Sequence, residues 1–435
     1  MKKRNVLFCV VLALAGICQG AGFTILEQSA NGMGRALAGM AADTEDPSAL
    51  YFNPSTPAWS ETAKISLGTH FLYVGTGYED HGSDPIAGHH AGGNYGGWSY
   101  IPNLYYVQPI TKNISFGLGF SATSGTRMDY CPKWLGRYTS IETEIAVMDM
   151  SPVIAWKITD NLSIGGGLLG EYAEMTMSRA LSLPQMGATG IGYVDGQMKM
   201  QGDSVALGYT FGILYEPLAG TKIGLGYRSR MKHDVDLKAR VRNGQNTKAL
   251  LDNYVERGVE HYIRSDGDAT LHLPTIINFG VEQQVTDRLK LMGDVSWSEW
   301  SVMKDITIKF DRPVLGTQKS KLDMKWGDNW KFAFGGTYEL TDKLTIRAGL
   351  AFDKTPVKDK WRNTCLPDAN RYWVSCGFGY KFNEHVTLNM AYTHLFMEHV
   401  SYTQAYEAQG GTHYLKGRAV DCSSDIYSIA VTYSF

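Results

Sequence analysis

The sequence predicts an all-β membrane protein: a 14-stranded antiparallel transmembrane β-barrel with an N-terminal hatch, or plug. Three observations predict it, namely a last strand with one apolar face, six short turns of one kind, and no transmembrane-helix run after residue 20. In that last strand, residues 424–435, bulky apolar side chains share one parity: Tyr427, Ile429, Val431, Tyr433 and Phe435. Such a strand lies between two different media, and in a soluble protein it would be an aggregation-prone edge.

The first twenty residues have the pattern of a secretion signal. A positive region, at Lys2, Lys3 and Arg4, is followed by an apolar stretch at 6–17. The apolar stretch is shorter than the about 20 residues that a membrane span needs, so residues 1–20 are interpreted as a signal peptide removed before Ala21. A lipoprotein signal at Cys18 is disfavoured because Ile17 stands where a small residue is required.

The composition of the chain suits a barrel wall. Over all 435 residues the mean hydropathy is −0.20, and the chain contains 48 Gly and 25 Tyr. Without the three basic signal residues, 38 basic residues stand against 43 acidic ones, a formal charge of −5. This charge gives no support to a nucleic-acid partner. Export with a barrel pattern predicts the bacterial outer membrane.

Six short turns set the strand count. Each joins an apolar strand end to a new alternating run through turn-forming residues, at 111–113, 159–161, 218–220, 286–288, 341–343 and 383–385. Asn, Asp and Gly favour such turns, and a barrel with both termini in the periplasm has its short turns there. Six turns join twelve strands, and a first and a last strand make 14, an even number as expected.

The strands follow from the alternation between these turns. They are predicted at 64–73, 98–107, 114–120, 145–157, 162–177, 205–216, 222–237, 269–284, 289–309, 331–340, 344–352, 371–382, 386–396 and 424–435. The barrel domain therefore covers 61–435, and residues 21–60 precede it as the hatch. A 14-stranded barrel encloses a lumen wide enough for such a segment. A disordered periplasmic tail is the alternative, and Phe23 and Asn53-Pro54-Ser55 argue against it.

Four cysteines follow the signal. Cys376 shares parity with outward aromatic residues and is expected to face lipid, whereas the others fall in predicted outer loops: Cys131, Cys365 and Cys422. Export permits disulfides. A Cys365–Cys422 bridge is predicted, and a bridge involving Cys131 stays open because connectivity cannot be read from sequence.

A set of motifs along the whole chain resembles the FadL/TodX family of outer-membrane transporters of long-chain fatty acids and hydrophobic compounds. They are A-G-F at 21–23, N-G-M-G-R-A-L-A-G at 31–39, L-Y-F-N-P-S at 50–55, Y-R-S-R-M-K-H at 227–233, L-P-T-I-I-N-F-G at 273–280, W-S-E-W-S at 297–301, W-G-D-N-W-K-F-A-F-G-G-T-Y at 326–338, A-F-D-K-T-P-V at 351–357 and P-D-A-N-R-Y-W at 367–373. The family's usual Asn-Pro-Ala has Ser55 here.

The resemblance implies a monomer that takes up long-chain fatty acids or similar molecules passively. It implies an outer-loop groove, an internal pocket at the mature N-terminus, and lateral exit at a kink in the third strand. The kink's counterpart is 121–126, where the family's Pro-Phe-Gly is only partly kept, as Thr123-Ser124-Gly125. Monoaromatic or aliphatic hydrocarbons are the alternative cargo. Expected partners are the ligand, outer-membrane lipid and lipopolysaccharide, and the barrel assembly machinery.

Strand parity places several charges in the lumen, since an Arg or Lys facing lipid at the midplane costs about 2–4 kcal/mol. They are Arg228, Arg230, Asp294, Lys331, Arg347, Asp353 and Arg371. A fatty acid needs an apolar path with one or two cations for its carboxylate, so Arg228, Lys331 and Arg347 are candidate substrate ligands. The alternative is a lumen salt-bridge network with Asp294 and Asp353 that only neutralises buried charge.

Further roles are assigned by position. Phe23 is expected to form an apolar wall of the inner pocket or to anchor the hatch. Asn53, Pro54 and Ser55 are expected to hold the hatch and gate the path without binding substrate. Candidate girdle positions at the membrane interface are Trp98, Trp156, Trp297, Trp300 and Trp373, of which Trp373 has lumen parity.

Other classes of function receive little support. A G-x-G-x-x-G match at 165–170 lies inside a predicted strand, not before a helix as a dinucleotide site requires. His81, His89 and His90 share a loop without diagnostic metal spacing. No G-x-S-x-G or H-E-x-x-H motif occurs. No cofactor, metal or enzymatic activity is therefore predicted. The rivals are a lipase-like barrel and an adhesin or surface receptor.

Overall fold

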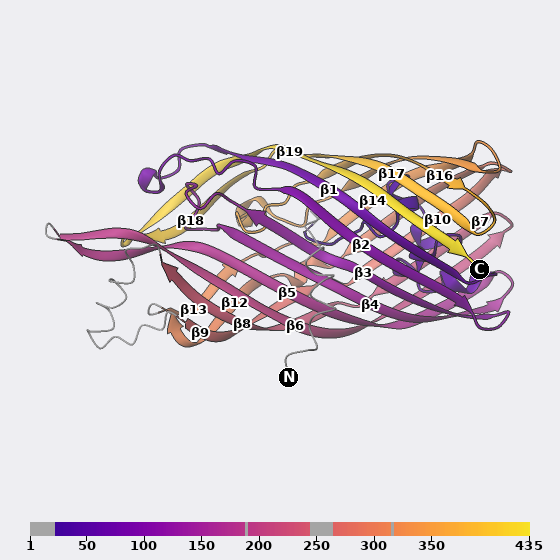
Figure 1. Ribbon diagram of the computed structural model, residues 1–435, viewed down its shortest axis with the longest axis horizontal. Helices are drawn as coiled ribbons and strands as arrows, with labels where there is room; N and C mark the ends of the chain where they lie inside the picture. Colours follow the sequence, from indigo (N-terminus) through magenta and orange to yellow (C-terminus); the bar gives the residue numbers. More distant parts are fainter. Residues whose placement is uncertain (1–21, 188–189, 244–263, 315–316) are drawn as a thin grey trace.

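The protein is a closed antiparallel β-barrel in a computed structural model that describes residues 22–187, 190–243, 264–314 and 317–435 (Figure 1). The predicted signal peptide lies outside the described residues. Strand β1 (Lys64–Asp80) pairs with β2 (Gly97–Pro109) on one side and with β19 (Gly411–Ser434) on the other. Because the first and last strands pair from Lys64↔Ser434 to Asp80↔Gly417, the sheet has no free edge.

The remaining strands complete the wall in chain order. They are β3 (Ile114–Asp129), β4 (Glu142–Thr159), β5 (Leu162–Gly187), β6 (Gly190–Leu218), β7 (Thr221–Arg228), β8 (Met231–Asn243), β9 (Arg264–Leu273), β10 (Ile276–Thr286), β11 (Leu289–Ser298), β12 (Asp305–Val314), β13 (Thr317–Asp323), β14 (Asn329–Glu339), β15 (Leu344–Asp353), β16 (Arg371–Lys381), β17 (Val386–Met397) and β18 (Ser401–Ala408).

Five of the barrel's strands are interrupted, which reconciles nineteen strand segments with 14 barrel strands. Segments β7 and β8 both pair with β6, and β17 and β18 both pair with β19. The other three interrupted strands are β9 with β10, β11 with β12, and β13 with β14. The predicted 14-stranded barrel is therefore confirmed.

The six predicted short turns all lie at one end of the barrel, and the longer connections lie at the other (Figure 1). One feature at the loop end exceeds the prediction: β5 and β6 form a hairpin that extends beyond the neighbouring strands. Their pairing continues from Leu162↔Tyr215 to Gly187↔Gly190, so both strands are longer than their predicted ranges.

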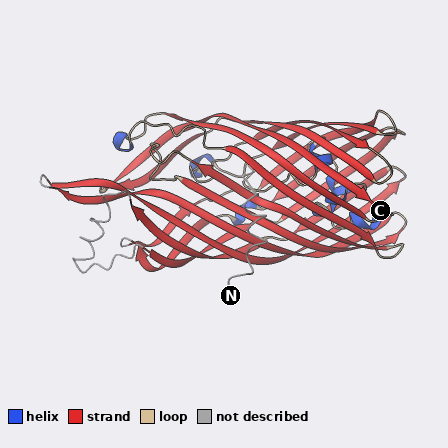
Figure 2. Ribbon diagram, in the orientation of Figure 1, coloured by secondary structure: helices blue, strands red, loops and turns tan. Residues whose placement is uncertain are grey.

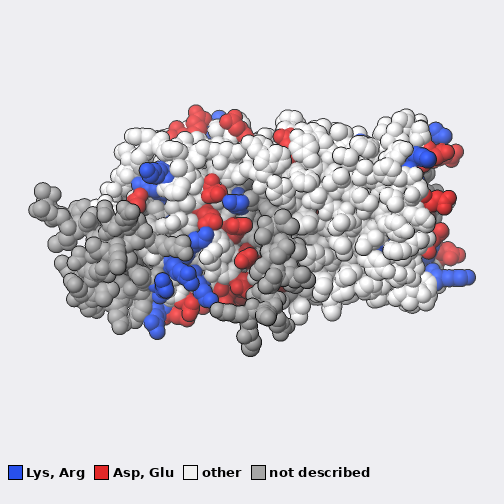
Figure 3. Space-filling view, viewed as in Figure 1, with Lys and Arg blue, Asp and Glu red and all other residues white. Residues whose placement is uncertain are grey.

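The outer wall is apolar between its two charged ends (Figure 3). Bulky side chains on the outward parity are exposed, among them Leu207 at 82% and Leu168 at 68%. Inward residues of the same strands are buried, as the period of two predicts. No helix within the described ranges has the length and apolarity needed to cross a membrane.

Residues 22–60 lie inside the barrel. They form α2 (Ala30–Met33) and three 3₁₀ turns, η1 (Met40–Ala42), η2 (Pro47–Tyr51) and η3 (Thr56–Trp59). These short helices gather toward the end with the short turns (Figure 2). Helix α2 packs on β16 and β17, η1 on β7 and β10, and η3 on β3, β4 and β5, so the segment meets the wall on several sides.

Glycines of the wall allow this close approach. A methyl group at Gly165 would collide with the Pro54 carbonyl, and one at Gly212 would collide with the Asn53 side chain. The G-x-G-x-x-G match at 165–170 lies within β5, and its first glycine makes room for the hatch backbone.

Three further 3₁₀ turns lie in connections, η4 (Pro85–Ala87), η5 (Trp300–Val302) and η6 (Asp359–Trp361). The predicted Cys365–Cys422 bridge is not formed, and the four cysteines of the described ranges are free. Cys365 is buried with its thiol against the Thr139 carbonyl, whereas Cys422 contacts the Thr76 hydroxyl, so the two sulfur atoms have different surroundings. Cys376 is exposed on the outer face, as its parity indicated.

Candidate functional site

Phe23 lies at the centre of an aromatic cluster inside the barrel. It is fully buried, with ring centroids 4.7 Å from Trp300 and 6.0 Å from Trp326. Trp300 was grouped with the candidate girdle residues, and this assignment is wrong because its side chain is buried against Phe23. The reason is local: β11 ends at Ser298, and η5 turns the indole into the lumen. Trp98 and Trp156 are exposed on the outer wall.

The backbone around Phe23 is bonded to β3. The Gly125 N–H donates to the Phe23 carbonyl at 2.8 Å, and the Ile25 N–H donates to the Thr123 carbonyl at 2.9 Å. Between Ala122 and Ser124 the pairing of β3 with β4 shifts register, which makes Thr123 an extra residue in the strand. The kink candidate from the sequence, Ser124 and Gly125, lies at this bulge. The first described residues of the hatch lie beside it, with Thr24 bridged to Ser124.

An apolar cluster surrounds Phe23 and is rich in methionine. Its methionines come from β5, β6, β8 and the β11–β14 region: Met175, Met177, Met198, Met200, Met231, Met303 and Met324. Unbranched thioether side chains adapt to irregular apolar shapes better than branched ones do. The cluster therefore gives the lumen an adaptable apolar lining next to Phe23.

Lys331 joins the wall to the hatch. Its ammonium donates a hydrogen bond to the Ala36 carbonyl at 3.0 Å and lies 4.9 Å from the centroid of Trp373. Ala36 and the following Leu37 have φ of 55° and 66°, an uncommon conformation for residues with a side chain. The lysine therefore holds a strained turn of the hatch, and Trp373 is buried in the lumen as its parity indicated.

Arg371 and its acids continue this polar region. The guanidinium pairs with Asp368 and lies 3.7 Å from Asp353, and Asp368 also accepts from the Gly22 N–H at 3.1 Å. Among the buried N–H-bearing atoms that find no hydrogen-bond partner in the described protein groups are Trp300 Nε1, Trp326 Nε1, Trp373 Nε1, Arg371 Nε and Arg371 Nη1. Buried donors of this kind are costly, and they suit a ligand that brings acceptor oxygens.

Arg228 is buried elsewhere in the lumen and already has partners. It pairs with Asp149 and lies 4.2 Å from the ring centroid of Tyr51. The prediction that lumen acids neutralise lumen cations therefore holds for Arg228, although its partner is Asp149 and not Asp294 or Asp353. Arg230 was placed in the lumen by parity, and this placement is wrong: it is exposed, because the strand is interrupted between Arg228 and Met231.

Arg347 lies on the other side of the hatch from Phe23. It lines a polar cavity of about 510 Å³ with Arg35, Asp43 and residues of the short-turn end. Its Nε and Nη1 have no partner among the described protein groups. Arg35 pairs with Asp43 at 2.5 Å. Burial alone would raise the pKa of Asp43, but the Arg35 guanidinium outweighs this effect and lowers that pKa to about 2.

Asn53 fixes the hatch to the wall through its side chain. Its Nδ2 donates to the Ala41 carbonyl at 2.7 Å and to the Ile213 carbonyl of β6 at 3.0 Å. Its Oδ1 accepts from the Ser55 hydroxyl at 2.7 Å and from the Ser55 N–H at 3.1 Å. Pro54 lies against Gly165 of β5. The departure from Asn-Pro-Ala thus adds one hydrogen bond, because Ser55 supplies a hydroxyl.

A buried network beside the β3 bulge was not anticipated. His233 Nδ1 lies 2.9 Å from the Ser204 hydroxyl, and His233 Nε2 lies 3.1 Å from Glu171. Glu171 in turn accepts from the Thr123 hydroxyl at 3.3 Å. The only available signal was the inward parity of these residues. Within the described ranges, no group of three His, Cys, Asp or Glu side chains could hold a metal ion.

Comparisons with known proteins agree with this architecture. A family model described as outer membrane protein transport protein (OMPP1/FadL/TodX) matches residues 11–435. Outer membrane protein P1 of Haemophilus influenzae is 26% identical over 437 residues, covering 91% of this chain and 90% of the relative. A long-chain fatty acid transport protein of Escherichia coli is 24% identical and covers 96% of both chains. The crystal structure of a Pseudomonas aeruginosa FadL homologue superposes with a TM-score of 0.87 at 25% identity, covering 95% of this chain and 100% of that one.

Proposed function

Because the chain belongs to the OMPP1/FadL/TodX family of outer membrane transport proteins, we propose that it takes up long-chain fatty acids passively across the outer membrane. The relative from Escherichia coli carries that cargo in its name. The observation that carries the proposal is the pairing of two features inside the barrel. A methionine-rich apolar cluster surrounds Phe23, and unpartnered N–H donors lie at Trp300, Trp326, Trp373 and Arg371.

These features match the two ends of a fatty acid. The alkyl tail requires a dry, adaptable path, which the apolar cluster provides. The carboxylate requires donors, and charge-assisted hydrogen bonds to it are stronger than those to neutral acceptors. A hydrocarbon would leave the buried donors unpartnered, so this arrangement favours the acid over the alternative cargo.

Lys331 couples the bound carboxylate to the hatch in this proposal. The ammonium bonds the Ala36 carbonyl within the left-handed turn of Ala36 and Leu37. A carboxylate is a stronger acceptor for an ammonium than a peptide carbonyl is. Binding would therefore compete for Lys331 and release the strained turn, so that occupancy of the pocket loosens the hatch.

Of the three candidate cations, Lys331 is assigned to the substrate. Arg228 is committed to Asp149, and Arg347 lies across the hatch in the polar cavity. Phe23 is assigned to the pocket wall, and Asn53, Pro54 and Ser55 to holding the hatch. The contacts of Asn53 with β6 and of Pro54 with β5 support the assignment of these hatch residues.

The exit is proposed at the β3 bulge. Thr123 interrupts the regular pairing of β3 with β4 directly beside Phe23. An irregular strand beside the pocket is where the wall requires the least distortion to open sideways. We also propose that the chain acts as a monomer without catalytic activity and that the barrel assembly machinery inserts it.

Uptake of radiolabelled oleate tests the proposal. Cells that lack their own fatty acid transporter should gain oleate uptake when they express this chain. They should gain much less when they express the Lys331→Met variant at the same level in the outer membrane. No gain with the unaltered chain would overturn the proposal, and release of fatty acid from phospholipid by the purified barrel would favour the enzyme alternative.

A further inference from the structure

The wall of the barrel changes from strands to loops beside the aromatic cluster of Phe23. The pairing of β14 with β15 ends at Lys331↔Asp353. Beyond this pair the chain continues as a first connection, 324–328, which precedes β14, and a second connection, 354–370, which follows β15. The two connections contain no strand residues, so the wall depends here on loop contacts and not on a ladder.

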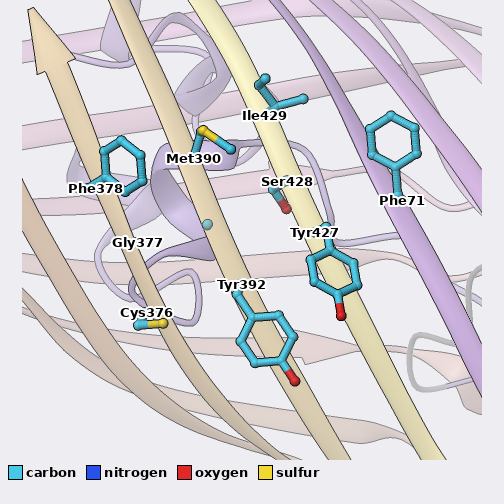
Figure 4. A pocket seen from close by; sticks show the side chains of 10 residues that line it. Phe71, Cys376, Gly377, Phe378, Met390, Tyr392, Tyr427, Ser428 and Ile429 are labelled. Atoms are coloured by element: carbon cyan, nitrogen blue, oxygen red, sulfur yellow. The ribbon is translucent and has the colours of Figure 1, made fainter.

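Few backbone bonds hold the two connections together. Within the described ranges, one backbone hydrogen bond joins them, from the Gly327 N–H to the Pro356 carbonyl at 2.8 Å. The wall is built differently behind the apolar groove of about 410 Å³ across β16, β17 and β19, where a ladder pairs Cys376 with Tyr392 and Tyr392 with Tyr427 (Figure 4). A segment with few backbone bonds opens at a lower free-energy cost than a ladder does, so the two connections are the weaker of these two places.

The inner side of both connections is apolar. Met324 and Trp326 of the first connection and Val357 of the second are buried in the methionine-rich apolar cluster. The ring centroid of Trp326 lies 6.0 Å from that of Phe23. Lys325, between the two buried residues of the first connection, is exposed and has φ of 46°, which is uncommon for a residue with a side chain. The first connection is therefore a single strained layer between the surface and the cluster.

The exposed side of the connections is basic. Lys325 Nζ and Lys360 Nζ lie 3.9 Å and 5.5 Å from the ring centroid of Trp361, so two ammonium groups share one indole. Lys358 borders the same place, because a methyl group on Gly327 would lie 3.5 Å from its Cε. All three lysines are exposed. Cations gathered in this way attract an anion from solution.

Few acids oppose these lysines. Across 324–328 and 354–362, five basic residues stand against two acidic ones, Asp328 and Asp359, a formal charge of +3. Two acids here already have ion-pair partners: Asp359 with Arg362 at 2.6 Å, and Asp323, directly before the first connection, with Lys321 at 2.7 Å. In the part of the chain that the structure describes, none of the three lysines around Trp361 forms an ion pair. An anionic group therefore suits this surface.

The two connections lie just above the apolar band of the wall. The Lys354 N–H donates to the Trp330 carbonyl at 3.0 Å, and Trp330 is exposed and stacked with Phe332 on the outer wall. Aromatic girdle residues mark the interface of a membrane barrel. Since the short turns lie at the opposite, periplasmic end, the lysines face the polar layer outside the membrane, from which a fatty acid anion arrives.

We propose that the two connections form a lateral entrance for long-chain fatty acid anions, an inference that rests on the proposed cargo. Lys325, Lys358 and Lys360 bind the carboxylate on the exposed side. When the connections separate, the alkyl tail passes between Trp326 and Val357 and reaches the methionine-rich apolar cluster. A neutral hydrocarbon would gain nothing from the lysines, and an acidic protein would gain nothing from the apolar inner side.

Charge reversal tests the carboxylate site. Cells that express the full-length Lys325→Glu/Lys358→Glu/Lys360→Glu variant should need an about fivefold higher oleate concentration for half-maximal uptake, because the carboxylate is repelled. The matched control, Lys238→Glu/Arg240→Glu/Arg264→Glu, reverses three exposed cations of β8 and β9 at the same end of the barrel. At an equal level in the outer membrane, it should take up oleate like the unaltered chain. Unaltered half-maximal uptake in the triple lysine variant would overturn the proposal.

A steric variant tests the passage itself. A Cβ atom at Gly327 meets only ordinary contacts, so Gly327→Trp is accommodated and places its ring over the entrance. Initial oleate uptake should slow severalfold, whereas equilibrium oleate binding by the purified barrel should stay unchanged. Gly170→Trp, at an equally open glycine of β5, is the matched control and should change neither. An unchanged initial rate in Gly327→Trp would overturn the entrance alone, whereas absence of uptake by the unaltered chain would overturn the proposed cargo and the entrance with it.

Discussion

At the residue scale, Phe23 is assigned to the wall of the proposed pocket. Phe23→Ala removes two aromatic contacts, each worth about 0.5–1.5 kcal/mol. We expect binding of a fluorescent fatty acid in detergent to weaken about tenfold, which corresponds to ~1.4 kcal/mol. Phe23→Leu keeps an apolar wall and should bind almost normally. Unchanged affinity in Phe23→Ala would reduce the residue to an anchor of the hatch.

Lys331 and Arg347 separate two models of carboxylate recognition. If Lys331 meets the carboxylate, Lys331→Met should weaken oleate binding ten- to a hundredfold, given about 1.5–3 kcal/mol for a hydrogen bond to a charged group. Arg347→Met should have little effect on affinity, because Arg347 lies across the hatch. Titration calorimetry of oleate binding to both variants distinguishes the two models. A loss confined to Arg347→Met would move the carboxylate to the polar cavity.

Parity predicted residue positions well where strands are continuous and failed where they break. Lys331 and Trp373 lie in the lumen and Cys376 lies outside, as alternation requires. Arg230 was misplaced because β7 ends at Arg228 and the period of two was continued across that break. Trp300 was assigned to the girdle from its position near a strand end, although it shares the lumen parity of Asp294 and is buried.

At the element scale, Asn53 is one of several side chains that attach the hatch to the wall. Asn53→Ala removes the bonds to Ala41 and Ile213, each worth about 0.5–1.5 kcal/mol. We expect a looser hatch and a severalfold faster influx of large hydrophobic antibiotics. Asn113→Ala, in an exposed periplasmic turn, is the matched control. Equal influx in both variants would show that Asn53 does not hold the path closed.

The β3 bulge makes a second prediction at this scale. Deleting Thr123 would join Ala122 to Ser124 and restore regular pairing with β4. Oleate uptake by cells should fall at least tenfold, whereas binding by the purified barrel should change little. Deleting Thr111, in a periplasmic turn, controls for loss of one residue. Normal uptake after the Thr123 deletion would rule out exit at this strand.

Turn chemistry allowed the elements to be counted. The structure places the six Asn-, Asp- and Gly-containing turns where the sequence predicts them. The pairing of β1 with β19 follows from the resulting strand count. The β5–β6 hairpin was underestimated because its alternation weakens beyond Met177, while backbone pairing continues to Gly187. Pairing with a neighbouring strand, which local pattern does not reveal, extends it.

At the scale of the whole molecule, the proposed site combines residues of the barrel wall with residues of the hatch. Lys331 could be assigned to the lumen from sequence, but its partner Ala36 lies 295 residues away. The Arg228–Asp149 pair likewise joins distant strands. Parity shows which side of the wall a residue faces. It does not show which residues meet across a lumen that 14 strands enclose. The different roles proposed for Arg228, Lys331 and Arg347 therefore required the structure.

The most direct test of the central claim is a displacement measurement on the purified barrel in detergent. A fluorescent long-chain fatty acid is bound first, and oleate and toluene are then titrated as competitors. The proposed pocket predicts displacement by oleate at a concentration at least tenfold below that of toluene, since oleate has both a longer tail and a carboxylate. Displacement by toluene at the lower concentration would contradict fatty acid recognition.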